Sequence, residues 1–139
     1  MKVFHGTSSL AWKKIQVEGW KCREDADWLL GKGVYFTLSE EAAWFYAKAA
    51  ANRQGGEPLV LQTQVPDEVI WSTWGEGQWE VFSRHQPVIR AKFSGALVSI
   101  DYLGFTDTDQ VIIWDEDLLK KLVLVPAETS QTGRESRSG

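Results

Sequence analysis

The pattern of hydrophobic and polar positions changes character near residue 58 of the 139-residue chain. Before that point, apolar residues recur at helical spacing in segments 10–18 and 42–51, and small hydroxyl residues stand before each segment. After it, short runs of β-branched and aromatic residues alternate with turn-rich breaks. Helices early and strands late, without regular alternation, predict an α+β fold with a mostly antiparallel or split sheet.

In the first half, segment 2–5 is expected to form a strand and residues 6–9 a polar turn that caps the first helix, with Gly19 as its stop signal. Residues 21–30 are charged, show no clear period and are interpreted as a surface loop. Two glycines then precede a β-branched and aromatic triplet, so a tight turn should lead into a strand at 34–36. Ser39 and the two glutamates after it predict the start of the second helix, which residues 52–57 end.

In the second half, the apolar runs are all interpreted as strands: 59–65, 69–71, 79–82, 88–93, 97–100, 111–114 and 122–125. No repeat at a fixed period occurs. Residues 1–127 are therefore expected to form one domain around one core. Residues 128–139 carry no apolar anchor, and we expect them to be a mobile tail.

Composition narrows the possible functions. Fifteen basic residues against 19 acidic ones give a net charge of -4, so no global basic field is present to hold a polyanion, and Arg84, Arg90 and Lys92 are too few to form one. Cys22 is the single cysteine, which excludes an internal disulfide, and two histidines leave a Cys/His zinc site without ligands. We therefore expect no metal.

No apolar run approaches the roughly 18–20 residues that a bilayer span requires, and the amino end turns polar after four residues, unlike a signal peptide. These features predict a soluble, cytoplasmic protein with no membrane partner, in its own cell or, for a toxin, in a target cell. The eight tryptophans are expected to pack a small core, and any of them that borders a pocket could hold a flat ligand. Dinucleotide-fold, Walker, zinc-protease and serine-hydrolase motifs are absent.

What remains is a spacing of three elements. The tripeptide His5-Gly6-Thr7 ends the first expected strand, the run GKGVYF at 31–36 contains Tyr35, and Tyr46 lies eleven residues later on the second helix. This set resembles the ADP-ribosyltransferases of the poly(ADP-ribose) polymerase and diphtheria toxin type. The resemblance implies a split antiparallel sheet with two main helices. It also implies NAD as substrate: His5 would bond the adenosine ribose, Gly6 the nicotinamide amide, and the two tyrosines would sandwich the ring.

The chemistry of NAD cleavage asks for such groups independently. The nicotinamide bond breaks through an oxocarbenium-like state, so a site must hold a flat leaving group, fix two riboses and stabilise positive charge. Aromatic faces can hold the ring, with each pair contributing about 0.5–1.5 kcal/mol. A glycine lets a ligand approach the backbone.

The third catalytic element departs from the family pattern. Family members place a glutamate at the start of a late strand, and the matching run here, 110–115 followed by 118–125, puts Gln110 at that position. A glutamine amide can bond a ribose hydroxyl but brings no negative charge. A charged hydrogen bond exceeds a neutral one by roughly 1–2 kcal/mol, and loss of a preorganised group costs about 10²–10³ in rate. We therefore expect slow transfer or none, and no polymer elongation.

A second candidate for the acid is Glu80, because Gln78-Trp79-Glu80 is similar to the Gln/Glu-x-Glu element of other ADP-ribosyltransferases and begins a strand-like run. Residues 83–90 are also similar to the small rifamycin-modifying enzymes of this class, whose acidic residue lies earlier. By that comparison Asp67 or Glu68 is a third candidate. Gln110 is favoured as the positional equivalent because its downstream apolar register matches over sixteen residues.

The resemblance thus implies an NAD-dependent mono-ADP-ribosyltransferase, a glycosyltransferase, with Gln110, Glu80 and Tyr35 as catalytic candidates and His5, Gly6, Thr7, Tyr35 and Tyr46 as NAD-binding candidates. The acceptor, whether protein, nucleic acid or small molecule, stays open. The alternatives are a degenerate module that binds NAD, ADP-ribose or a protein partner, an NAD glycohydrolase, and an enzyme similar to RNA 2′-phosphotransferases.

Overall fold

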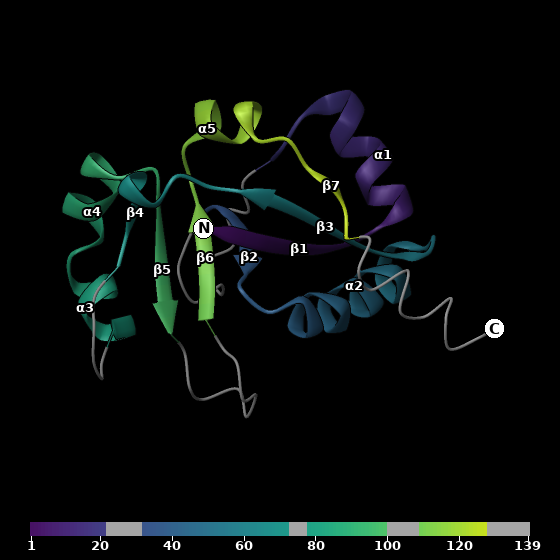
Figure 1. Cartoon of the computed structure of the whole chain (residues 1–139), viewed down its shortest axis with the longest axis horizontal. Helices are drawn as coiled ribbons and strands as arrows, with labels where there is room; N and C mark the ends of the chain where they lie inside the picture. The colour runs from purple at the N-terminus through teal and green to yellow at the C-terminus, as the bar shows by residue number, and fades with distance from the viewer. Residues whose placement is uncertain (22–31, 73–77, 100–108, 128–139) are drawn as a thin grey trace.

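The computed structural model describes residues 1–21, 32–72, 78–99 and 109–127. These residues form an α+β fold built on a seven-stranded mixed sheet, with strand order β4-β5-β6-β2-β1-β3-β7 (Figure 1). The strands are β1 (Lys2–Ser8), β2 (Val34–Thr37), β3 (Pro58–Gln64), β4 (Ile70–Trp71), β5 (Gly95–Ser99), β6 (Asp109–Ile113) and β7 (Val125–Pro126). The helices are α1 (Ser9–Glu18), α2 (Glu40–Gln54), α3 (Gln78–Arg84), α4 (Gln86–Lys92) and α5 (Glu116–Lys121), with a 3₁₀ turn at Asp67–Val69.

In the first half of the chain the helix signals are confirmed, but the predicted turn at 6–9 is wrong: β1 continues to Ser8 and Ser9 already begins α1. The Ser8 hydroxyl caps α1 by accepting the amide N–H of Ala11 at 3.1 Å, and Ser39 caps α2 in the same way. Gly19 and Gly55 end these two helices with positive φ angles, which glycine adopts without strain. The predicted loop at 21–30 lies outside the described residues except for its first residue, as does the predicted tail at 128–139.

Two of the predicted strands are wrong. Segments 79–82 and 88–93 form the helices α3 and α4, and Pro87 lies in the first turn of α4, where its missing N–H costs nothing. This correction also changes the sheet. Because helices connect β4 to β5, the chain crosses over between them, and the two strands pair in parallel rather than antiparallel. The remaining pairs are antiparallel, so the sheet is mixed.

The predicted last strand at 122–125 is also largely wrong. Leu118 and Leu119 belong to α5, and the strand after it is reduced to β7. The helix forms here because the Asp115 carboxylate caps it, accepting the amide N–H groups of Asp117 and Leu118 at 3.0 and 3.4 Å. The Ser94 hydroxyl donates to the other oxygen of this carboxylate at 2.8 Å and is the main cause that lowers the pKa of Asp115.

Replacement of Asp115 by alanine should therefore lower the free energy of unfolding by about 1–2 kcal/mol, the usual cost of a lost helix cap. Asp115→Asn keeps a capping oxygen and should lose less, and Ser94→Ala removes one bond and leaves the cap in place. Urea denaturation of the three variants measures these differences. A loss in Asp115→Ala no greater than that in Ser94→Ala would contradict the capping role.

The two faces of the sheet carry separate cores, because side chains alternate along each strand. One face packs against α2, α3 and α4, and α3 and α4 lie at the β4–β5 end of the sheet in Figure 1. Its buried residues are Phe4, Ala43, Ala47, Val60, Phe82, Ile89, Ala96, Val98, Ile112 and Ala127. The other face carries Val3, Val34, Phe36, Val65, Ile70, Val111, Ile113 and, from α5, Leu119.

The Arg90 side chain is not free to form a basic patch with Arg84 and Lys92. Its guanidinium donates to the Lys32 carbonyl oxygen at 2.9 Å and to Gln86, and it lies 4.6 Å from the centre of the Trp114 ring. The Trp114 indole N–H donates to the Phe93 carbonyl oxygen at 2.8 Å. Arg90 therefore ties α4 to the turn that precedes β2, which is a structural role.

Within the part of the chain that the structure describes, both edges of the sheet are short. The edge strands β4 and β7 have two residues each, and Pro126 in β7 lacks an N–H group. Five longer strands lie between them.

Candidate functional site

The sheet is weakly joined between β1 and β2. Along these two strands the only paired residues are Phe4 and Thr37, whereas β1 pairs with β3 over its whole length. Met1 exchanges backbone hydrogen bonds with Val65, the residue opposite it. Because alternate residues of a strand direct their N–H and C=O groups to opposite sides, the backbone groups of Gly6 are directed towards β2. They therefore border the place where the two strands separate.

The His5 side chain bonds across this separation. Its Nδ1 lies 2.8 Å from the carbonyl oxygen of Tyr35, and since a carbonyl only accepts, Nδ1 carries the proton and donates it. Burial is the larger influence on the imidazole and lowers its pKa below the ordinary 6.5, while the bond to Tyr35 acts in the opposite direction. At neutral pH the ring is therefore uncharged, and its Nε2 is a hydrogen-bond acceptor.

A pocket of about 580 Å³ opens at this separation, a size typical of small-molecule sites. Six of the nine candidate residues from the sequence line it: His5, Gly6, Thr7, Tyr35, Tyr46 and Gln110. They come from β1, β2, β6 and α2. Their roles in binding or catalysis stay predictions, but His5, Tyr35 and Tyr46 all belong to the lining of one pocket.

Gln110 is the second residue of β6 and lies opposite Thr37 of β2. Its side chain is only 9% exposed. Within the described part of the chain, its amide has no hydrogen-bond partner, and the residue lines the pocket. An amide in this position can donate to a ligand and accept from it, and it does so without charge.

Glu80 is placed elsewhere. It does not begin a strand but lies in the first turn of α3, where it is exposed, and it is not among the residues that line the pocket. The reason is the one that makes segment 79–82 helical: Phe82 is buried against the sheet and the residues around it face solvent. The structure therefore offers no contact between Glu80 and the other candidates.

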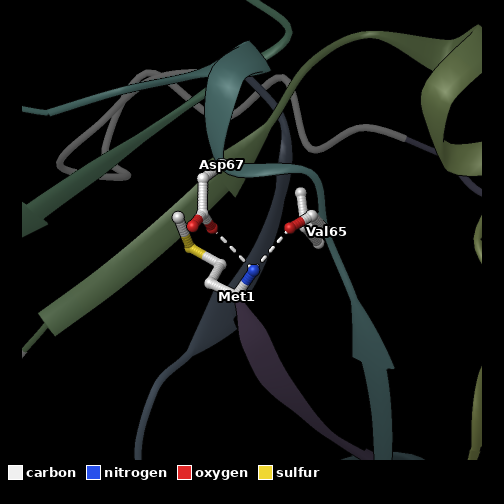
Figure 2. A network of polar contacts seen from close by, with 3 residues as sticks. All are labelled: Met1, Val65 and Asp67. Atoms are coloured by element: carbon white, nitrogen blue, oxygen red, sulfur yellow. Dashed lines mark hydrogen bonds and ion pairs between the residues drawn. The ribbon is translucent and has the colours of Figure 1, made fainter.

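The Asp67 side chain is paired with the amino group of Met1, just before β1. Its carboxylate accepts a hydrogen bond from the amino group of Met1 at 2.6 Å, and the same amino group donates to the Val65 carbonyl oxygen (Figure 2). The Asp67 side chain is 76% exposed. Neither Asp67 nor Glu68, the weaker candidates for the acid, lines the pocket.

Sequence reasoning missed Trp20 as a site residue. It follows the stop signal Gly19, lines the pocket and contacts the His5 ring. The other lining residues that were not anticipated include one face of α1 (Leu10, Ala11, Lys14, Ile15 and Glu18) and the last turns of α2 (Ala49, Ala50, Arg53 and Gln54). Their helical spacing was visible, but nothing in the sequence showed that this face of α1 borders a pocket rather than the core.

The lowered pKa of His5 makes stability depend on pH. Well above pH 6.5 the ring is neutral in both states. As the pH falls through 6.5 towards the lower pKa of the folded state, the unfolded chain takes up the proton first, and stability is lost in that window. We expect His5→Gln to flatten this part of the profile, measured by urea denaturation between pH 7.5 and 5. The exposed His85 provides the control. Equal slopes in the parent and His5→Gln would contradict the neutral ring in the folded state.

No family model and no curated protein matches the chain. Within residues 1–21, 32–72, 78–99 and 109–127, no three His, Cys, Asp or Glu side chains gather in a group that could hold a metal ion. The helices of the same residues include none with the length and apolar character needed to cross a bilayer.

Proposed function

We propose that the pocket between β1 and β2 binds NAD and that the protein transfers ADP-ribose from it to an acceptor, as a slow mono-ADP-ribosyltransferase. The observation that carries the proposal is the meeting of His5, Gly6 and the two tyrosines at a separation in the sheet. These four residues lie up to 41 positions apart in the sequence. Packing of the core alone does not require them to meet at one place.

The Gly6 backbone supports the proposal by its direction. An N–H donor and a C=O acceptor on one strand edge can pair with a primary amide, which offers the complementary acceptor and donor. The nicotinamide group is such an amide. The neutral imidazole of His5 adds an acceptor, which suits a ribose hydroxyl, and the faces of Tyr35 and Tyr46 suit a flat ring.

In the proposed reaction the bond between nicotinamide and ribose breaks, nicotinamide leaves with the bonding electrons, and a nucleophile of the acceptor bonds to the same ribose carbon and loses a proton. Gln110 can hold a hydroxyl of this ribose, but as a neutral amide it contributes little to stabilising the developing positive charge. The low rate that we propose follows from this single residue.

Incubation of the pure protein with NAD, followed by measurement of nicotinamide release and of the thermal shift, tests the proposal. We expect slow release and a raised melting temperature. His5→Ala and Tyr46→Ala should abolish both, whereas His85→Ala, which changes an exposed residue outside the pocket lining, should change neither.

The other outcomes separate the remaining candidates. A thermal shift without release would favour an NAD- or ADP-ribose-binding module, and the buried neutral Gln110 is the observation that supports it. If nicotinamide is released and all of the ADP-ribose is found free in solution, the protein is a glycohydrolase. If nicotinamide is released only when 2′-phosphorylated RNA is present, the protein is the phosphotransferase. If the protein shows no thermal shift with NAD and releases no nicotinamide, the proposal is overturned. Mass spectrometry of a cell extract treated with labelled NAD then identifies the acceptor.

A further inference from the structure

Trp20 lies against the His5 ring. Gly19 ends α1 with φ 85°, and its N–H donates to the Ile15 carbonyl oxygen at 2.7 Å, so the chain reverses there and brings Trp20 back towards β1. The centres of the indole and imidazole rings are 5.2 Å apart with an interplanar angle of 87°, an edge-to-face contact. Phe36 of β2 contacts the same imidazole at 5.4 Å and Trp20 at 6.1 Å.

The imidazole is thus in contact with two aromatic rings, and one of its nitrogens is fixed on a backbone oxygen. A half-turn of the ring would bring a carbon atom to the Tyr35 carbonyl oxygen and lose that hydrogen bond. We propose that Trp20 is a positioning residue, which holds His5 in the orientation where Nδ1–H donates to Tyr35 and Nε2 is left as an acceptor for a pocket ligand. A ligand atom at Nε2 must then be a hydroxyl or N–H donor.

Other polar groups near the pocket do not replace this role. Lys14 and Glu18 of α1 and Lys21, which follows the helix, line it, and Glu18 pairs with both lysines, at 4.0 and 3.5 Å. Arg53 and Tyr46 line the pocket from α2, and Tyr35 lines it from β2. Among the residues that the structure describes, the one polar contact of the imidazole is with the Tyr35 carbonyl oxygen. Because burial lowers the pKa of His5, removal of the Trp20 ring should admit water and raise it.

Nitrogen NMR of ¹⁵N-histidine-labelled protein tests the proposal, since the chain has only two histidines and ring ¹⁵N shifts report tautomer and protonation. In the parent we expect a neutral His5 protonated on Nδ1. Trp20→Leu should mix the two tautomers and shift the His5 titration midpoint upwards, and Trp20→Phe, which keeps an aromatic ring, should restore most of the parent behaviour. Trp12→Leu is the matched control, because the Trp12 ring contacts Trp20, with 6.1 Å between ring centres, and is not among the described ring contacts of His5.

Parent-like tautomer and midpoint in Trp20→Leu would overturn the proposal, as would an equal change in Trp12→Leu. If Trp20→Leu does not fold, measurements on the parent protein provide the test. Cross-relaxation between the Trp20 and His5 rings, together with a proton on Nδ1, supports the proposal. A His5 protonated on Nε2 overturns it. The test needs no NAD, so its failure and that of the proposed function are distinguishable.

Discussion

Gln110→Glu should raise the rate of nicotinamide release from NAD by about 10²-fold, the size of effect typical of one preorganised electrostatic group. The residue is buried, lines the pocket and has no hydrogen-bond partner among the described residues, so a carboxylate there would face the ligand and oppose the positive charge that develops on the ribose. Stopped assays of nicotinamide release at saturating NAD measure the difference in kcat.

The matched control is Gln62→Glu. Gln62 of β3 lies opposite Phe4, which in turn lies opposite Thr37, so it shares the face and the row of Gln110 but does not line the pocket. The same charge placed there should leave the rate unchanged. Both variants are expected to lose stability, because burial of a carboxylate disfavours its charged form. An equal rate in the parent and Gln110→Glu, both folded, would show that position 110 does not face the reacting ribose.

Gly6→Ala should lower the free energy of unfolding by about 3 kcal/mol, the upper range for overpacking, and the melting temperature by roughly 10 °C. A methyl group on Gly6 would collide with the carbonyl oxygen of Ala43 and would lie 2.7 Å from the amide nitrogen of Ala47, both in the backbone of α2. A side chain could rotate away, but a helix backbone cannot without moving the whole element. Calorimetry of the variant measures the loss.

Gly19→Ala separates steric overlap from backbone strain. Gly19 has φ 85° and ψ 174°, a backbone region that only glycine adopts readily, yet a methyl group there would meet nothing within 4 Å, so this variant should lose about 2 kcal/mol through strain alone. A loss in Gly6→Ala no larger than in Gly19→Ala would contradict the close contact of β1 with α2. The Gly6 contact also means that this residue has a structural reason to be glycine, besides the open backbone that the pocket uses.

The elements that the sequence predicts correctly carry their signals locally. Ser8 and Ser39 cap the helices that follow them, and Gly19 and Gly55 end the same helices. Each signal acts through a hydrogen bond or a backbone angle within a few residues of itself, so no knowledge of the rest of the chain is needed.

The helices α3 and α4 were missed because seven residues span fewer than two turns. Each buries one large side chain from this stretch, Phe82 in α3 and Ile89 in α4, and a single buried position shows no period. The β-branched and aromatic neighbours then favoured a strand. Pro87 was the readable signal, since proline often stands in the first turn of a helix and rarely inside a strand.

The candidate site was predictable in its residues but not in its geometry. The motifs around His5 and Tyr35 indicate which side chains could meet, and both line the pocket. The separation of β1 from β2 depends on contacts between distant segments, such as the bond from His5 to the Tyr35 carbonyl 30 residues away. Trp20 reaches the pocket through the turn at Gly19, and no pattern of spacing predicts where such a turn directs the chain.

The brevity of β4 and β7 has a consequence for the protein in concentrated solution. A neighbouring chain that approached either border of the sheet would find two residues to pair with, and at β7 one of them is a proline that cannot donate. The five longer strands, which could template cross-β growth, are enclosed between these borders. The segments most able to form amyloid are thus protected by their position inside the sheet rather than by charge.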